Sequence, residues 1–267
     1  MTKNKKRVTH LINVENLLEV VKLVVISGFL KNHKPLSMLL VGKSDMGKTE
    51  ITSSFKAKNI VFLTDLSSSG VYNLLKNLDL THIIIADFTK ITMKAKQTSH
   101  NLLTTLNSVM EEGLFRQELK DTTNDNKGRN IGIITSTTKA SFGQNKKFME
   151  SFGLTSRFLI VSYDYEESTI DKIMDSIYKC EYLQKQYKGI DIKDNNGKKI
   201  KKLDVIIPEA LARQLNKDKK NEFRTQKQLQ TLACCSALTE NRKEVNIKDI
   251  EKVKSLNKFF NLNYTKI

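Results

Sequence analysis

Short runs of consecutive apolar residues recur through the first two thirds of the chain, separated by segments in which apolar residues have helical spacing. Five runs predict strands, at residues 36–41, 59–64, 83–85, 131–136 and 158–162. Undiluted apolar runs of this length are typical of strands buried on both faces of a parallel sheet. The intervening segments predict helices at residues 14–31, 71–78 and 98–112. Strands that alternate with helices indicate an α/β domain built on a parallel sheet.

The pattern changes near residue 166. Residues 165–187 and 208–260 have helical periodicity, and the polar segment 189–202 contains Asn195-Asn196-Gly197, which favours a hairpin-like turn. A weaker strand is expected at 114–120, followed by a turn-rich segment at 121–130. We therefore predict a flexible basic arm at 1–10, an α/β domain at 11–165 and a helical domain at 166–267 with a basic insertion near 189–202.

A phosphate-binding motif follows the first predicted strand. It has the pattern G-x-x-x-x-G-K-[ST] and reads Gly42-Lys43-Ser44-Asp45-Met46-Gly47-Lys48-Thr49. The glycines allow backbone N–H groups to point at phosphate oxygens, Lys48 supplies a flexible ammonium group, and Thr49 supplies a hydroxyl for Mg²⁺. The helix that begins here, with Glu50 in its first turn, adds the positive end of its dipole. The motif predicts that the chain binds ATP with Mg²⁺.

One acidic residue ends the third predicted strand, which reads His82-Ile83-Ile84-Ile85-Ala86-Asp87. The carboxyl ends of such strands face a phosphate loop, so Asp87 is a candidate for the magnesium-side carboxylate. The alternative is that Asp87 only caps the following helix. P-loop ATPases that hydrolyse ATP often have two adjacent acids at this position, and this chain has one. Hydrolysis would then be slow, or would use an acid elsewhere, such as Glu111 or Glu112.

The chain resembles the AAA+ ATPases. The resemblance rests on the phosphate loop, the acid-ended strand, the strand 131–136 with Thr137 and Thr138 after it, and Thr155-Ser156-Arg157-Phe158. It is most similar to the minichromosome maintenance helicases. Ala86-Asp87-Phe88-Thr89-Lys90 is similar to that family's Asp-Glu-Phe-Asp-Lys, with Asp87 at the position of the Glu.

The resemblance spans residues 15–257 and covers only the family's ATPase module, not its N-terminal DNA-binding domain. It implies that Thr137, or its neighbours Thr135 and Ser136, senses the γ-phosphate, and that Arg157 acts as an arginine finger on a neighbouring subunit. The segment from Arg224 through Gln228-Leu229 to 244–249 resembles the lid helices with their sensor arginine. Both arginines could instead be ordinary surface residues.

Charge and cysteine content add weaker information. The formal net charge of +16 favours a polyanionic partner such as DNA, although a lysine-rich surface explains it equally well. Five lysines of the basic insertion could contact nucleic-acid phosphates or only solvate a loop: Lys193, Lys198, Lys199, Lys201 and Lys202. Cys180, Cys234 and Cys235 do not have zinc or disulfide spacing, and no apolar segment is expected to cross a membrane. We expect a reducing, cytoplasmic location.

Two functions of different kinds fit these features. The first is an ATP-binding AAA+ ATPase that assembles into a ring or filament and acts on DNA as a motor, loader or switch. The second is an ATP-gated scaffold or protein-remodelling module with weak hydrolysis, suggested by the single acid at Asp87. A third, a monomeric small-molecule kinase, is disfavoured by the segment around Arg157 and by the helical C-terminal part.

Overall fold

The computed structural model describes residues 11–119, 122–180, 190–216 and 222–260. Its centre is a five-stranded sheet in which every strand pair is parallel, in the order β3-β4-β7-β1-β8. The strands are β1 (Ser37–Gly42), β3 (Ile60–Leu63), β4 (His82–Ile85), β7 (Gly132–Thr138) and β8 (Phe158–Ser162). The five predicted strands are confirmed, and the sheet is compatible with a P-loop NTPase-like fold.

Side chains of each strand alternate between two hydrophobic clusters, one on either face of the sheet. In β1, Met38 and Leu40 belong to one cluster, and Leu39 and Val41 to the other. All four are fully buried. Alternation combined with burial on both faces explains why the strands are apolar without interruption.

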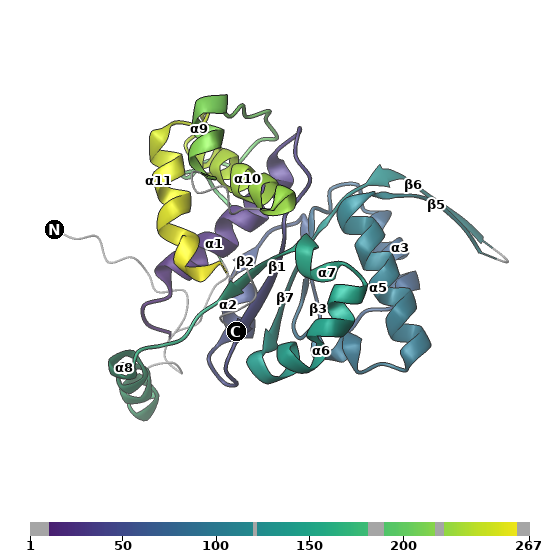
Figure 1. Ribbon diagram of the computed structural model, residues 1–267, viewed down its shortest axis with the longest axis horizontal. Coiled ribbons are helices and arrows are strands. Elements are labelled where there is room, and N and C mark those ends of the chain that lie inside the picture. The colour runs from purple at the N-terminus through teal and green to yellow at the C-terminus, as the bar shows by residue number, and fades with distance from the viewer. Residues whose placement is uncertain (1–10, 120–121, 181–189, 217–221, 261–267) are drawn as a thin grey trace.

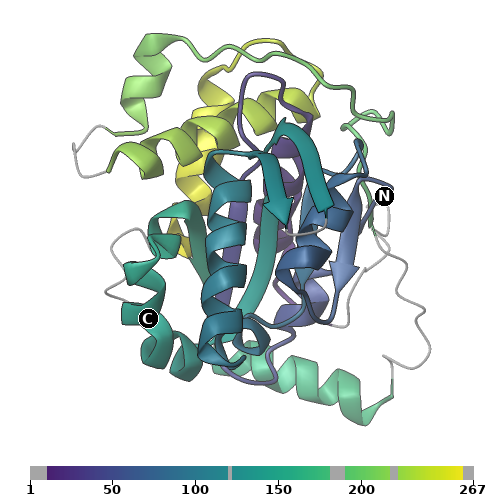
Figure 2. The same ribbon diagram turned by 90° about the vertical axis from the view of Figure 1, so that its right-hand side faces the viewer.

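Helices cover both faces (Figures 1 and 2). The first cluster is closed by α1 (Glu15–Ile26), α2 (Lys48–Thr52), α10 (Phe223–Thr239) and α11 (Ile247–Leu256). The second is closed by α3 (Ser68–Leu75), α5 (Lys96–Glu111), α6 (Lys139–Ser151) and α7 (Leu154–Arg157). The C-terminal helices thus share their core with α1 and one face of the sheet.

An antiparallel hairpin lies outside the sheet and projects from the molecule (Figure 1). It consists of β5 (Leu114–Leu119) and β6 (Thr122–Arg129) and joins α5 to β7. The expectation of turns at residues 121–130 was wrong, because β6 replaces most of that segment. Backbone pairing holds the ribbon, and β6 has no apolar period from which a strand could be predicted.

The remaining elements are short. The helix α4 (Thr89–Thr92) follows β4, and 3₁₀ turns occupy Ser27–Phe29 and Asn257–Phe259. The strands β2 (Phe55–Lys56) and β9 (Ile190–Asp191) pair in parallel, and α9 (Glu209–Gln214) precedes α10. The predicted turn in the basic insertion is present, since Asp194 and Lys198 are joined by a backbone hydrogen bond of 2.8 Å and Gly197 has φ of +77°. The predicted helix at 165–187 is α8 (Glu167–Tyr178); residues 181–187 and the arm at 1–10 lie outside the described residues.

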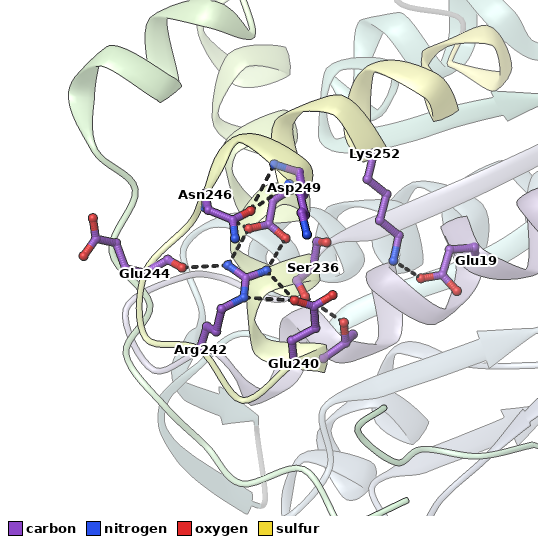
Figure 3. Close-up of polar contacts among 10 residues, drawn as sticks. Glu19, Ser236, Glu240, Arg242, Glu244, Asn246, Asp249 and Lys252 are labelled. Atoms are coloured by element: carbon purple, nitrogen blue, oxygen red, sulfur yellow. Dashed lines mark hydrogen bonds and ion pairs between the residues drawn. The ribbon is translucent and has the colours of Figure 1, made fainter. Parts of the chain in front are cut away.

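A buried ion pair fixes the junction between α10 and α11 (Figure 3). Both terminal nitrogens of Arg242 donate to the carboxylate of Asp249, each at 2.8 Å. Asp249 is 1% exposed and forms a capping box with Asn246. Lys252 pairs with Glu19, which fastens α11 to α1. The two C-terminal helices are therefore held to each other and to the body of the molecule by charge as well as by apolar packing.

Candidate nucleotide-binding site

The phosphate loop lies between β1 and α2, at the edge of the sheet where the strands have their carboxyl ends, here named the carboxyl edge. Gly47 adopts a left-handed conformation with φ of +73°. The ammonium group of Lys48 donates to the carbonyl of Lys43, so the loop closes around it. Burial lowers the pKa of Lys48, and the carboxylates of Asp45 and Asp87 act in the opposite direction. Strand, glycine loop and helix are thus in the order that the motif requires.

Side chains from two other segments support the loop from behind. The hydroxyls of Tyr163 and Tyr165, which follow β8, both donate to the carbonyl of Met46. Their rings pack edge to face at 5.4 Å. Burial raises the pKa of both phenols. The pKa of Tyr165 rises to about 12, because burial and the charge of Glu50 outweigh the hydrogen bond with Tyr163, which acts in the opposite direction. Both tyrosines therefore stay neutral donors. The carboxylate of Glu50 lies near this tyrosine pair.

Leu11 completes the support. A Cβ on Gly47 would lie 2.2 Å from the Cδ1 atom of Leu11, so any other residue here would have to displace the end of this side chain. The motif could not indicate either Leu11 or the two tyrosines. The only signal for the tyrosines was their position after the strand next to β1, which the strand order makes visible.

Asp87 lies beyond the end of β4 and is held in place from β7. The hydroxyl of Ser136 donates to the carbonyl of Ala86 at 2.9 Å, and the amide of Phe88 donates to the carbonyl of Ser136 at 2.9 Å. One carboxylate oxygen of Asp87 accepts the amide of Thr89 at 2.9 Å. Asp87 thus bonds to the first residue of α4, although the N-cap of that helix is Phe88 and no side chain caps it, and its charge also acts on Lys48. The two roles are compatible because a carboxylate has two oxygens.

The end of β7 lies between the phosphate loop and the acid. Thr137 is paired with Val41, and Thr138 with Gly42. Ser136 supports Ala86 and Phe88, and the hydroxyl of Thr138 caps α6 by accepting the amide of Ser141 at 3.1 Å. Thr137, the predicted sensor, is therefore next to the base of the loop. The structure brings together the phosphate loop, Asp87 and Thr137.

Arg157 and Arg224 lie elsewhere, at the opposite edge of the sheet, here named the amino edge. Phe158, the residue after Arg157, pairs with Ser37 at the start of β1. The phosphate loop begins five strand residues later, which corresponds to about 17 Å. That distance exceeds the length of an arginine side chain. Arg224 donates to the hydroxyl of Ser156 at 2.8 Å, so it belongs to the same edge as Arg157.

These two arginines line a cavity of about 290 Å³ at the amino edge. Lys34, His33 and Lys227 are also in its wall, and Glu111 is the acid there. Glu111 pairs with Lys34 at 3.3 Å and with Arg224 at 3.7 Å. Burial opposes ionisation of Glu111, but Lys34, Arg224 and Arg157 together lower its pKa. The cavity is rich in cations and suited to an anion.

Arg157 is folded back inside this cavity. Its Nη1 donates to the carbonyl of Gly153 at 2.8 Å, and within the described part of the chain its buried Nε has no hydrogen-bond partner. Burial lowers the pKa of Arg157, and the like charge of Arg224 lowers it further. The ion pairs with Lys34 and Arg224 hold Glu111 at the amino edge, far from the phosphate loop of its own chain. Glu112 is the next residue, directly after α5, and acts on the charge of Arg157. Neither acid can replace the missing partner of Asp87 within the same copy.

Neither a protein-family model nor a curated protein matches the sequence. No helix within the described ranges has both the length and the apolar character needed to cross a bilayer. Among the described residues, no three His, Cys, Asp or Glu side chains are grouped as metal ligands.

Proposed function

We propose that this chain is an AAA+-type ATPase that binds ATP with Mg²⁺ at its phosphate loop and assembles so that one copy completes the site of the next. The observation that carries the proposal is the arrangement at the carboxyl edge, where Gly47, Lys48 and Asp87 meet around one loop. The strand order supports it, because β7 lies between β1 and β4 and brings Thr137 between loop and acid.

The residues at the loop fit a nucleotide with magnesium. The left-handed Gly47 turns the backbone, Lys48 is a cation within the loop, and the exposed Thr49 is the first hydroxyl of α2. Magnesium usually takes one or two protein oxygens together with phosphate oxygens and water. Thr49 and Asp87 are the protein oxygens that this chain would supply. Bound magnesium would neutralise charge that develops on the phosphates during transfer.

The arginines of the amino edge are assigned to a neighbouring copy. Arg157 and Arg224 lie too far from their own phosphate loop, and the cavity that they line carries a surplus of positive charge. A triphosphate presented by a second copy would supply the missing anion and a partner for Arg157. Such an arginine stabilises the charge of the transition state and accelerates hydrolysis strongly in other NTPases. Assembly would be head to tail, as a ring or filament.

DNA is the polymer on which we propose that this motor or switch acts. The support is the net charge of +16 and the basic insertion at residues 189–202. The second candidate is an ATP-gated scaffold with weak hydrolysis. It is favoured by two observations: Asp87 has no second acid beside it, and Glu111 lies at the opposite edge.

Binding of a fluorescent ATP analogue in the presence of Mg²⁺ tests the nucleotide site. We expect Lys48→Ala to weaken binding about 10- to 100-fold, since it removes a charge-assisted contact to phosphate. Lys43→Ala is the matched control, because the exposed Lys43 contributes to the loop through its backbone. Equal affinity of the wild type and Lys48→Ala would reject the proposed function.

A further inference from the structure

The helix α8 has a wider apolar surface than the body of the molecule covers. Thr169 and Ile173 are buried, and Thr169 accepts a hydrogen bond of 2.9 Å from Asn13. Beside this buried line, Ile170, Met174 and Tyr178 are 40%, 38% and 73% exposed. Their spacing of four residues places them in one row along the helix. Figure 1 shows α8 standing away from the sheet and the other helices.

Acidic side chains flank this row. Glu167, Asp171 and Asp175 form a second line with the same spacing, directly next to the apolar row. All three are exposed, as is Glu166 before the helix. Against these four acids the helix and its two flanking residues have two basic residues, Lys172 and Lys179, in a chain with a net charge of +16. An acidic helix of this kind repels nucleic acid and anionic lipid and favours a basic protein surface.

The amino edge of the same chain offers the complementary features. Phe223, at the first turn of α10, is 91% exposed, more than the other large apolar side chains of the described ranges. Arg224 follows it, Lys227 is exposed on the next turn, and Lys34 is about half exposed across the cavity. Glu222 precedes the ring, and Glu111 pairs with Lys34 and Arg224, but the cations of the cavity outnumber these two acids. An exposed aromatic ring beside a cavity with a surplus of positive charge matches an apolar row among carboxylates.

We propose that α8 of one copy docks on the amino edge of a second copy of this chain, with its apolar row against Phe223 and its acidic line against Arg224, Lys227 and Lys34. The contact is head to tail, because α8 and Phe223 belong to different surfaces of one molecule. It rests on the proposed function in one respect, that copies associate around the nucleotide. It adds the segment that joins them.

The position of α8 in the chain agrees with this contact. The helix begins two residues after Tyr165, whose hydroxyl contacts the phosphate loop. A neighbour docked on α8 through Phe223 would therefore bring its basic cavity, whose wall contains Arg224, toward the segment that leads to the phosphate loop. In this proposal, the contact brings the two halves of the composite site together.

Site-specific cross-linking tests the contact in the full chain with Mg²⁺ and a non-hydrolysable ATP analogue. The background is Cys180→Ser, because Cys180 is exposed whereas Cys234 and Cys235 are buried. Met174→Cys and Phe223→Cys are introduced together, and a short bismaleimide is added. We expect dimers and a ladder of larger products on a denaturing gel. Met174→Cys combined with Ile206→Cys is the matched control, since Ile206 is an exposed apolar residue that lies outside the basic cavity, and we expect no ladder.

Sedimentation velocity gives a second readout that does not depend on the introduced thiols. We expect Asp171→Lys with Asp175→Lys to weaken self-association at least about tenfold without changing nucleotide affinity, because acids opposite basic residues strengthen association. When this double variant is mixed with a Lys227→Glu variant, the reversed charges attract again, and part of the association should be restored.

The outcomes separate this contact from the proposed function. If the wild type does not bind the analogue, the nucleotide site is rejected. The Met174–Phe223 cross-link tests the α8 contact separately. Nucleotide-bound oligomers without the Met174–Phe223 product overturn the α8 contact and leave the function standing. A product formed by Met174→Cys alone means α8 pairs with itself, and a nucleotide-bound monomer means that nothing docks there. Either result also overturns the proposal.

Discussion

Gly47 is required by its conformation and by its neighbour. Its φ is +73°, and Leu11 occupies the space that a Cβ would need. Gly197 has a similar φ of +77°, but apart from its chain neighbours no atom of the described residues lies within 4 Å of the corresponding Cβ position. The two glycines therefore separate the effect of backbone strain from the effect of contact within the phosphate loop.

We expect Gly47→Ala to abolish binding of the ATP analogue and to lower the free energy of unfolding by clearly more than Gly197→Ala. Gly197→Ala should cost about 1 kcal/mol, the strain of a left-handed non-glycine residue, and leave binding unchanged. Urea unfolding and analogue titration measure the two effects. Similar losses in both variants would show that Leu11 does not fix the loop.

His82 gives a pH dependence at the same scale. It is completely buried at the start of β4, and its ring nitrogens contact Thr81 and the carbonyl of Leu36 at 3.2 Å each. Burial lowers its pKa to about 4, although backbone hydrogen bonds act in the opposite direction. Gly28 and Gly132 make room for the ring, since a Cβ on either would lie 3.1 Å or less from it.

The imidazole of His82 takes up a proton near pH 6.5 in the unfolded chain but only near pH 4 in the folded chain. The free energy of unfolding is therefore not reduced by this group above pH 6.5. It should fall by up to about 3 kcal/mol as the pH decreases to 4. We expect His82→Leu to remove about one proton from the slope of unfolding free energy against pH in that window. Parallel curves for the two proteins would contradict a neutral buried His82.

At the scale of elements, the hydrophobic pattern was sufficient for the sheet and insufficient for the hairpin. The strands β1, β4, β7 and β8 are buried on both faces, and burial favours the apolar runs from which they were predicted. The edge strand β3 is only partly buried but has the same apolar pattern. The strand expected at 114–120 is β5, but its partner β6 lies outside the sheet and has no apolar pattern from which it could be predicted. The helix α6 was also missed, because only Phe142 and Met149 of its thirteen residues are buried hydrophobics.

The junction of α10 and α11 depends on one carboxylate. Burial disfavours its charge, but hydrogen bonds from Arg242, from the amide of Asn246 and from Ser236 prevail and lower the pKa of Asp249. Its stabilisation is therefore present above the ordinary carboxyl pKa and is lost as the pH falls below it. Glu240 contacts the same guanidinium from an exposed position, at 3.0 Å.

We expect Asp249→Asn to lower the free energy of unfolding by about 2 kcal/mol at neutral pH, because Arg242 keeps partial access to water. Glu240→Gln should cost less than about 0.5 kcal/mol, as an exposed pair does. Urea unfolding at pH 7 and pH 3 measures both. The deficit of Asp249→Asn should shrink at pH 3, and a deficit that stays constant would show that the charge of Asp249 is irrelevant.

At the scale of the molecule, the two edges of the sheet divide the candidate chemistry. Local motifs were sufficient to predict the phosphate loop, Asp87 and Thr137 as one group, since each lies at or directly after the carboxyl end of a parallel strand. They could not show that Arg224 and Glu111 meet Arg157 at the other edge, because that depends on how α10 packs against the start of β1. Under the proposed function, in which Arg157 acts on the phosphate, this separation makes hydrolysis dependent on a second copy.

Complementation between two inactive variants tests this dependence most directly. Lys48→Ala removes the cation of the loop, and Arg157→Ala removes the arginine of the amino edge, so each alone should hydrolyse ATP poorly. In an equimolar mixture, random head-to-tail assembly gives about a quarter of contacts an intact loop facing an intact arginine. We predict recovery of about a quarter of wild-type turnover per chain. A mixture no more active than the sum of its parts, or full activity of Arg157→Ala alone, would contradict a site shared between copies.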